Sequence, residues 1–229
     1  MFYIIHYINK TLATKMDFEK YRTLISAIKD SGCLTMVTPF DEVSVDKCVD
    51  FGVDIIKIAS SDINDKVLIK KIISANKPVI VSTGGSNLDD IDSIVRLFDS
   101  KSIPLAINHC VSQYPTEKQH LDLDQISFLK KRYQNNVVGF STHESNDDLG
   151  LAIMMAYAKG ARTFERHIDI DKDDIPVSPY CSLPEDIDKY FFNRKNTFQN
   201  NKNYSRVLDE RVYFPMADYA TRAYEGYKI

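Results

Sequence analysis

The sequence predicts an α/β fold of the TIM-type (β/α) barrel class, incomplete, with about six of the eight strands of a whole barrel. Short apolar runs recur along the chain without alternation of apolar and polar residues, which indicates parallel strands buried on both faces. Helical segments separate these runs, and each strand–helix unit takes about 20–30 residues, which favours a barrel over an open sheet. No G-x-G-x-x-G or P-loop motif supports a nucleotide-binding sheet instead.

The elements follow from hydrophobic periodicity and from helix capping signals. Asp17 suits an N-cap, and the helix after it carries Tyr21, Leu24, Ile25 and Ile28 as its apolar stripe. Strands are expected at residues 34–40, 55–60, 78–84, 105–110, 137–140 and 162–167. Helices are expected at 17–29, 44–51, 66–75, 88–98, 123–133 and 149–159, with a last one beginning at Pro184. We therefore expect a partial barrel domain over residues 1–192 and an irregular C-terminal tail over 193–229.

Composition narrows the class of function. With 229 residues and a net charge of −3, the chain has no basic footprint for nucleic acid or an acidic membrane. No apolar run reaches the roughly 18 residues that span a bilayer, and the apolar N-terminus lacks the features of a signal peptide. The four cysteines are scattered without a CxxC pair, as is typical of reduced thiols. We therefore expect a cytoplasmic protein without nucleic-acid or membrane partners.

Polar side chains gather where the expected strands end. Because catalytic groups of parallel α/β folds lie at the carboxyl ends of the strands, this edge is the expected active-site face. The residues concerned are Thr38, Lys57, Ser60, Asp62, Ser82, Thr83, His109, Ser112, Tyr114, Ser141, His143, Glu165 and His167.

Lys57 lies inside an otherwise apolar strand, where a lysine must pair with an anion or lose its charge. Three interpretations stay open. The side chain forms a structural salt bridge with a neighbour such as Glu165, clamps a phosphate or carboxylate of a ligand, or forms a Schiff base.

His143 and His167 end two runs that flank one helical segment, in the pattern of adjacent parallel strands. Such strands lie about 4.8 Å apart, so both imidazoles are close enough to share a metal ion. Hydrogen bonding alone is the alternative for each histidine. Glu165 and Asp62 lie nearby in this arrangement and favour a metal site. His109 is expected to be structural or to support the site from behind.

Several segments in consistent order resemble the sialic acid synthase family, which includes N-acetylneuraminate, legionaminate and pseudaminate synthases and spore-coat polysaccharide proteins. The resemblance covers about residues 30–190. The segments are VTPFDEVSVDKCVDFGVDIIKIASSDINDKVLIKKI, KPVIVSTGG, HCVSQYP, VGFSTHES and GARTFERHIDID.

The resemblance implies a transferase of carbohydrate biosynthesis that condenses phosphoenolpyruvate with an N-acetylated aminosugar, using Mn²⁺ or Mg²⁺. It implies metal binding by His143 and His167 and catalytic roles for Asp62 and Lys57. It places the substrates beside Thr38, Lys57, Ser60, Ser82, Ser112, Tyr114 and Ser141.

The chain departs from the family pattern at several points. Asp62 replaces the usual glutamate, Glu165-Arg166-His167 replaces E-K-H, and Ser178 stands where the family's sugar-binding loop has an aspartate. The family's first two strands and its C-terminal antifreeze-like domain have no counterpart, so we expect a homodimer or completion of the barrel by another chain. Two alternatives follow: a non-catalytic relative that acts as a binding or assembly module in surface-glycan synthesis, and an aldolase that uses Lys57 as a Schiff base.

Overall fold

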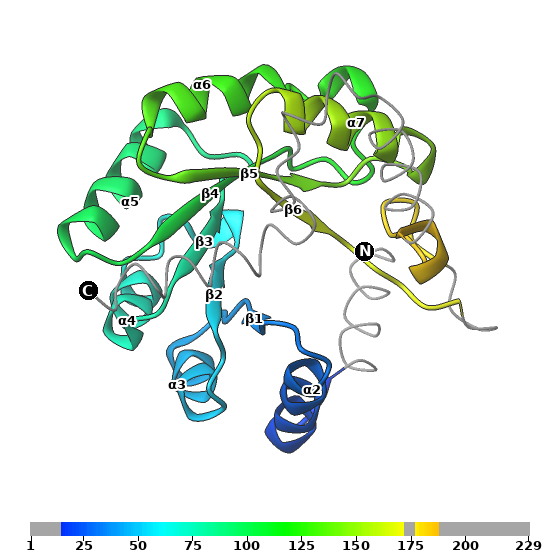
Figure 1. The fold of residues 1–229 in the computed structure, drawn as a ribbon. Coiled ribbons are helices and arrows are strands. Elements are labelled where there is room, and N and C mark those ends of the chain that lie inside the picture. Colours follow the sequence, from blue (N-terminus) through cyan, green and yellow to red (C-terminus); the bar gives the residue numbers. More distant parts are fainter. Residues whose placement is uncertain (1–14, 172–176, 188–229) are drawn as a thin grey trace, which may run out of the picture.

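The structure, a computed structural model, describes residues 15–171 and 177–187. Within them, six strands form one parallel sheet in the order β1-β2-β3-β4-β5-β6. The strands are β1 (Met36–Val37), β2 (Ile55–Ile58), β3 (Val79–Ser82), β4 (Leu105–Cys110), β5 (Val137–Thr142) and β6 (Thr163–Arg166). The sheet curls into part of a barrel, which confirms the predicted fold class (Figure 1). The predicted tail over 193–229 lies outside the described residues.

Helices connect successive strands and cover the outer side of the curved sheet (Figure 1). They are α2 (Phe18–Asp30), α3 (Glu42–Asp50), α4 (Lys66–Ala75), α5 (Leu88–Ser100), α6 (Asp124–Arg132) and α7 (Asn146–Ala158), with 3₁₀ turns η1 (Ser60–Asp62) and η2 (Lys118–His120). Asp17 caps α2 as predicted, because its carboxylate accepts the Lys20 N–H at 2.9 Å. Residues 184–187 are helical, and the rest of the helix expected after Pro184 lies outside the described residues.

Three predictions about single elements are wrong in detail. The strand expected at 34–40 is reduced to Met36–Val37, because the Asp54 carboxylate binds the backbone N–H of Thr35 at 2.8 Å and Pro39 has no N–H. Only Ile25 of the expected α2 stripe is buried, whereas Tyr21 and Leu24 are exposed. Helix α7 begins at Asn146, three residues earlier than expected.

The two faces of the sheet are filled differently. Outward side chains of the strands, such as Ile56, Val81 and Phe140, join the helices in one large apolar core. On the inner face, Ile55, Ile80 and Ala106 form a small apolar cluster near the beginning of the strands. Further along the same strands the inner positions become polar. The alternation of side chains along each strand therefore carries polar groups to the carboxyl-terminal end of the barrel interior.

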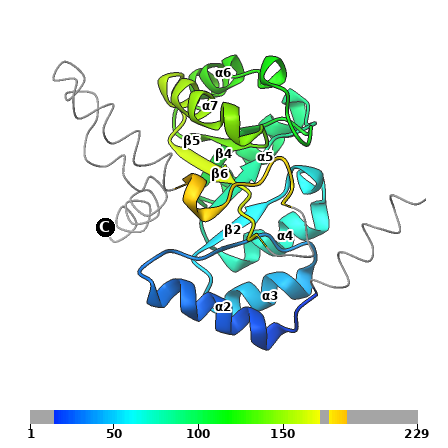
Figure 2. The same cartoon turned by 90° about the vertical axis from the view of Figure 1, so that its right-hand side faces the viewer.

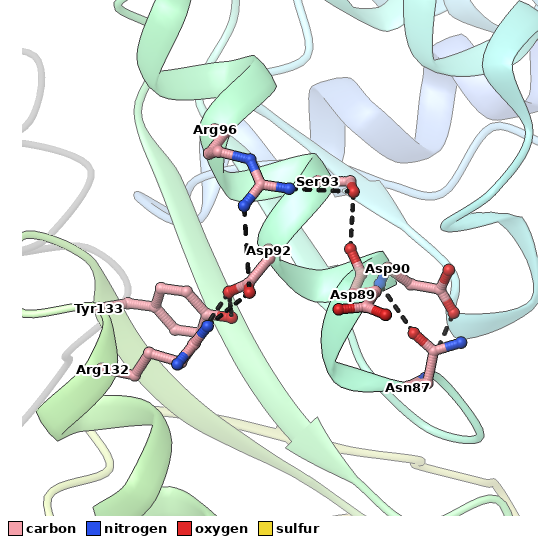
Figure 3. Close-up of polar contacts among 8 residues, drawn as sticks. All are labelled: Asn87, Asp89, Asp90, Asp92, Ser93, Arg96, Arg132 and Tyr133. Carbon is pink, nitrogen blue, oxygen red and sulfur yellow. Dashed lines mark hydrogen bonds and ion pairs between the residues drawn. The ribbon is translucent and has the colours of Figure 1, made fainter.

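A polar contact on the outer surface joins α5 to α6 (Figure 3). Arg132 and Tyr133, at the end of α6, both donate to the Asp92 carboxylate of α5, with a Tyr133 Oη–Asp92 Oδ1 distance of 2.6 Å. The hydrogen bond from Arg132, then that from Tyr133, lowers the pKa of Asp92 to about 2. At the beginning of α5, Asn87 and Asp90 form a reciprocal capping box.

The segment 177–187 lies beside β6 and the residues that follow it (Figure 2). The Ser182 N–H donates to the His167 carbonyl at 2.9 Å, and the Asp169 N–H donates to the Ser182 carbonyl at 3.0 Å. These bonds fix the segment next to the end of β6.

All four cysteines are free thiols. None of the helices in the described part of the chain is long and apolar enough to cross a membrane.

Candidate active site

The site lies where β2, β5 and β6 end. In the ladder between β5 and β6, Ser141 pairs with Glu165, and Thr142 pairs with Arg166. His143 and His167 follow one position later on the two strands. Because side chains alternate along a strand, Ser141, His143, Glu165 and His167 share the inner face. The sequence prediction that the two histidines are neighbours is confirmed, since their ring centroids are 5.2 Å apart.

Lys57, Glu165 and Ser141 form an ionic cluster at the buried end of the site. The Lys57 Nζ lies 3.2 Å from Glu165 Oε1, and the Ser141 hydroxyl donates to the same oxygen at 3.1 Å. Lys57 is only 8% exposed. The second carboxylate oxygen of Glu165 is buried and has no hydrogen-bond partner among the described residues. The salt bridge with Glu165, one of the three interpretations that the sequence left open, is therefore present, and an acceptor atom is left over for a further donor.

His143 is buried and oriented by the backbone. Its Nδ1 lies 3.2 Å from the Val111 carbonyl, which can only accept, so Nδ1 carries the proton and Nε2 keeps a free lone pair. Burial lowers the pKa of His143 to about 4, and the neighbouring His167 adds to the effect. Although His167 is exposed as a residue, the groups packed around its ring desolvate it and lower its pKa as well. Both imidazoles are therefore neutral near pH 7.

Two tyrosines surround the histidine pair. The Tyr114 ring lies 4.2 Å from the His143 ring, and Tyr180 approaches His167 edge-on at 5.4 Å. The sequence prediction included Tyr114 but missed Tyr180. Tyr180 lies in a proline-containing segment with no periodic pattern, so no local signal pointed to it.

Ser60 and Ser112 meet around a glycine after β3. A Cβ on Gly84 would lie 2.5 Å from Ser112 Oγ, 2.6 Å from Cys110 Sγ and 3.4 Å from Ser60 Oγ. Only glycine leaves room for these three side chains to converge. The Cys110 thiol, which sequence reasoning missed, is hydrogen-bonded to Gly84 and Ser60, and burial raises its pKa.

The other predicted residues have different surroundings. The Ser82 hydroxyl and Asp62 Oδ2 are buried without a hydrogen-bond partner among the described residues. Thr38 is half-buried after β1, and no hydrogen bond within the described ranges links it to the cluster. His109 faces outward, where Nε2 contacts the Leu121 carbonyl at 2.9 Å and the ring stacks on Phe140, so it is structural as expected.

The donor atoms fit part of a metal coordination shell. Two neutral imidazoles, one of them held by a backbone carbonyl, are a common pair of transition-metal ligands. Within residues 15–171 and 177–187, no group of three or more His, Cys, Asp or Glu side chains is arranged to hold an ion. A metal bound here would take its remaining ligands from water or substrate.

The curved parallel sheet and the groups at its carboxyl end define a (β/α)-barrel protein with a buried Lys57–Glu165–Ser141 cluster beside a histidine pair. The NeuB family model matches residues 6–199. The chain belongs to the NeuB family, which confirms the resemblance found in the sequence.

Curated relatives support this membership. The chain is 34% identical over 167 residues to the N-acetylneuraminate-9-phosphate synthase of Drosophila melanogaster, covering 72% of this chain and 44% of that protein. It is 32% identical over 162 residues to the N,N'-diacetyllegionaminic acid synthase of Campylobacter jejuni, covering 69% and 47%. The chain thus spans less than half the length of these relatives.

Solved structures agree with the fold. A spore coat polysaccharide biosynthesis protein E from Chromobacterium violaceum superposes with a TM-score of 0.81 at 34% identity, covering 88% of this chain and 58% of that one. The spore coat polysaccharide biosynthesis protein spsE from Bacillus subtilis superposes with a TM-score of 0.74 at 26% identity, covering 87% and 56%.

Proposed function

We propose that this chain takes part in nonulosonic acid synthesis and condenses phosphoenolpyruvate with an N-acetylated aminosugar. The observation that carries the proposal is the Lys57–Glu165–Ser141 cluster beside the histidine pair, in a barrel of the NeuB family. Relatives named as N-acetylneuraminate-9-phosphate and N,N'-diacetyllegionaminic acid synthases support this class of product. The Lys57 ammonium group and hydroxyl donors, which suit a small dianion, lie at the same end of the barrel.

In the proposed reaction, carbon 3 of phosphoenolpyruvate forms a bond to the aldehyde carbon of the sugar, and the aldehyde oxygen gains a proton. Water adds to carbon 2, and phosphate leaves with its oxygen, which yields a 2-keto acid. Lys57 would hold the charged groups of phosphoenolpyruvate. Asp62, whose buried Oδ2 has no hydrogen-bond partner among the described residues, would accept a proton from the water.

The remaining predicted substrate residues have hydroxyl groups that can bind oxyanions or sugar hydroxyls. We assign the sugar to Tyr114 and phosphoenolpyruvate to the other hydroxyl residues. The phosphoenolpyruvate group comprises Thr38, Ser60, Ser82, Ser112 and Ser141.

We also propose that His143 and His167 hold a divalent ion, Mn²⁺ or Mg²⁺. The neutral state of both imidazoles supports this role. Such an ion supplies Lewis-acid polarisation of the sugar aldehyde. The contribution of the protein is to orient the two rings, through the Val111 carbonyl for His143 and through the Ser182 N–H bound to the backbone of His167.

The test is phosphate release from phosphoenolpyruvate, measured with N-acetylmannosamine and Mn²⁺. Lys57→Met should lower kcat/KM by about 100-fold or more, because it removes the charge that faces the substrate. Lys71→Met is the matched control, since Lys71 forms an ion pair with Asp46 within the helical layer. Absence of phosphate release from the unmodified protein would refute the proposal.

The Schiff-base alternative is less well supported. A Schiff base requires a free Nζ, whereas the Lys57 Nζ is engaged in an ion pair with Glu165 Oε1 at 3.2 Å. Borohydride trapping with a keto acid would nevertheless reveal such an adduct. The non-catalytic alternative predicts ligand binding without phosphate release. The phosphate-release assay therefore distinguishes it from the proposed synthase.

We further propose that another polypeptide, either a second copy or a different chain, completes the barrel. Among the described residues, β1 and β6 each pair with a strand on one side only. Unpaired strand edges favour association. Light scattering coupled to size-exclusion chromatography tests this proposal, and a strictly monomeric active protein would contradict it.

The free thiols fit a cytoplasmic location.

A further inference from the structure

Tyr180 completes a ring of four aromatic side chains at the open end of the site. Its ring lies 5.3 Å from Tyr114, 5.4 Å from His167 and 6.5 Å from His143, edge-on to all three. Tyr114 and His143 are themselves 4.2 Å apart, and the two histidines are 5.2 Å apart. Tyr180 lies 14 residues after the last residue of β6, whereas the other three members lie within four residues of the end of a strand.

The segment that carries Tyr180 is held by a specific set of polar contacts. Arg166 donates to the Ser182 hydroxyl at 2.9 Å, to the Glu144 carbonyl at 2.7 Å and to the Asn146 side chain at 3.1 Å. The Asn146 amide in turn donates to the Cys181 carbonyl at 3.1 Å. These contacts flank Tyr180 on its C-terminal side, so they fix where its ring lies relative to the histidines.

The site is polar at its buried end and aromatic at its open end. Lys57 is 8% exposed, whereas Tyr114 is 51% exposed. Tyr180 is intermediate. If phosphoenolpyruvate binds at Lys57, the sugar that reacts with it therefore lies against the four aromatic side chains. Aromatic faces bind methyl groups and C–H-rich surfaces, and a tyrosine hydroxyl adds a donor and an acceptor.

We propose that Tyr180 is a specificity-determining residue that packs against the N-acetyl group of the aminosugar, and that Arg166 is its positioning residue. This inference rests on the proposed function. An N-acetyl group combines an apolar methyl with an amide, and the ring and hydroxyl of a tyrosine match both parts. The Tyr114 ring contacts the Tyr180 ring edge-on at 5.3 Å, so the two tyrosines present one aromatic surface.

The test measures binding of N-acetylmannosamine and of mannosamine, which lacks the acetyl group, by ligand-observed NMR in the presence of Mg²⁺ and without phosphoenolpyruvate, so that the proposed reaction does not consume the sugar. The unmodified protein should favour the N-acetylated sugar. Tyr180→Ala should reduce that preference by about tenfold, the usual effect of one small apolar group in a pocket. Tyr180→Phe should keep most of the preference, because it keeps the ring.

Two further variants separate position from mere folding. Arg166→Lys should weaken binding of the N-acetylated sugar but leave phosphoenolpyruvate binding unchanged, because lysine cannot replace the three contacts of the guanidinium group. Tyr21→Ala, at an exposed tyrosine of α2, should change neither. Melting temperatures of all variants show whether each one is folded.

The inference is overturned if Tyr180→Ala discriminates between the two sugars as well as the unmodified protein does, or if the unmodified protein does not discriminate. Phosphorus NMR of phosphoenolpyruvate separates this failure from failure of the proposed function. If phosphoenolpyruvate binds and Lys57→Met abolishes that binding, only the role of Tyr180 is wrong. If phosphoenolpyruvate does not bind, the proposed function is wrong as well.

Discussion

Inside the barrel, the side chains of Asn108 and Thr163 meet directly over Gly139 of β5. The Thr163 hydroxyl donates to Asn108 Oδ1 at 2.8 Å, and a Cβ on Gly139 would lie 1.8 Å from Thr163 Oγ1 and 2.1 Å from Asn108 Oδ1. The hydrogen bond that ties β4 to β6 across β5 therefore requires glycine. This requirement comes from three strands at once, so the sequence around Gly139 alone does not reveal it.

Gly139→Ala should destabilise the protein by about 1–3 kcal/mol, the usual cost of overpacking a core. Urea unfolding measures the loss. In a Thr163→Ala background the same substitution should cost less, because one of the three clashing atoms is gone, although Asn108 Oδ1 and the Thr163 carbonyl oxygen remain. An equal cost in both backgrounds would show that the Thr163 side chain is not the obstacle.

His143 provides the residue-scale prediction for metal binding. If the proposed site exists, Mn²⁺ at about a hundredfold excess over its Kd should stabilise the protein by about 2.7 kcal/mol and raise the melting temperature. His143→Ala should abolish this shift. His120→Ala is the control, because His120 is exposed and contacts Gln113 away from the histidine pair. No shift in the unmodified protein would contradict the metal proposal.

At the scale of elements, α5 and α6 are joined through Asp92 (Figure 3). The carboxylate is held by Arg132 and Tyr133, and burial followed by the hydrogen bond to Asp92 raises the pKa of Tyr133 to about 12. Because folding lowers the pKa of Asp92 from 3.8 to about 2, its contribution to stability is fully present above pH 3.8. The contribution is lost as the pH falls through about 2.

Asp92→Asn should therefore lower the melting temperature by a few degrees at neutral pH. The difference from the unmodified protein should shrink as the pH falls below 3.8 and should be small below about 2. Thermal unfolding followed by circular dichroism at several pH values measures it. Asp99→Asn, at an exposed position near the other end of α5, should have little effect at any pH. A difference that does not depend on pH would contradict the ionic origin.

At the scale of the whole molecule, one apolar core runs from Ile25 of α2 to Ala161 before β6. The helices and strands between them share it, so the described part of the chain should unfold as one cooperative unit. Ile72 of α4 is fully buried in this core, whereas Val67 on the same helix is 63% exposed.

Ile72→Ala should lower the free energy of unfolding by about 2–5 kcal/mol, and Val67→Ala should change it little. Circular dichroism and tyrosine fluorescence should report the same shifted transition, since the chain has 13 tyrosines and no tryptophan. Two separate transitions would show that the half-barrel consists of independent parts.

The sequence by itself determined the strand order, most helix positions and the inner-face alignment of Lys57, Ser141, His143, Glu165 and His167. These properties follow from local periodicity and from the rule that consecutive parallel strands lie side by side. Tertiary structure alone decided the ring completed by Tyr180, the convergence around Gly84 and the crossing over Gly139. Each of these depends on atoms from segments distant in the chain, whose approach is set by packing and not by any local pattern.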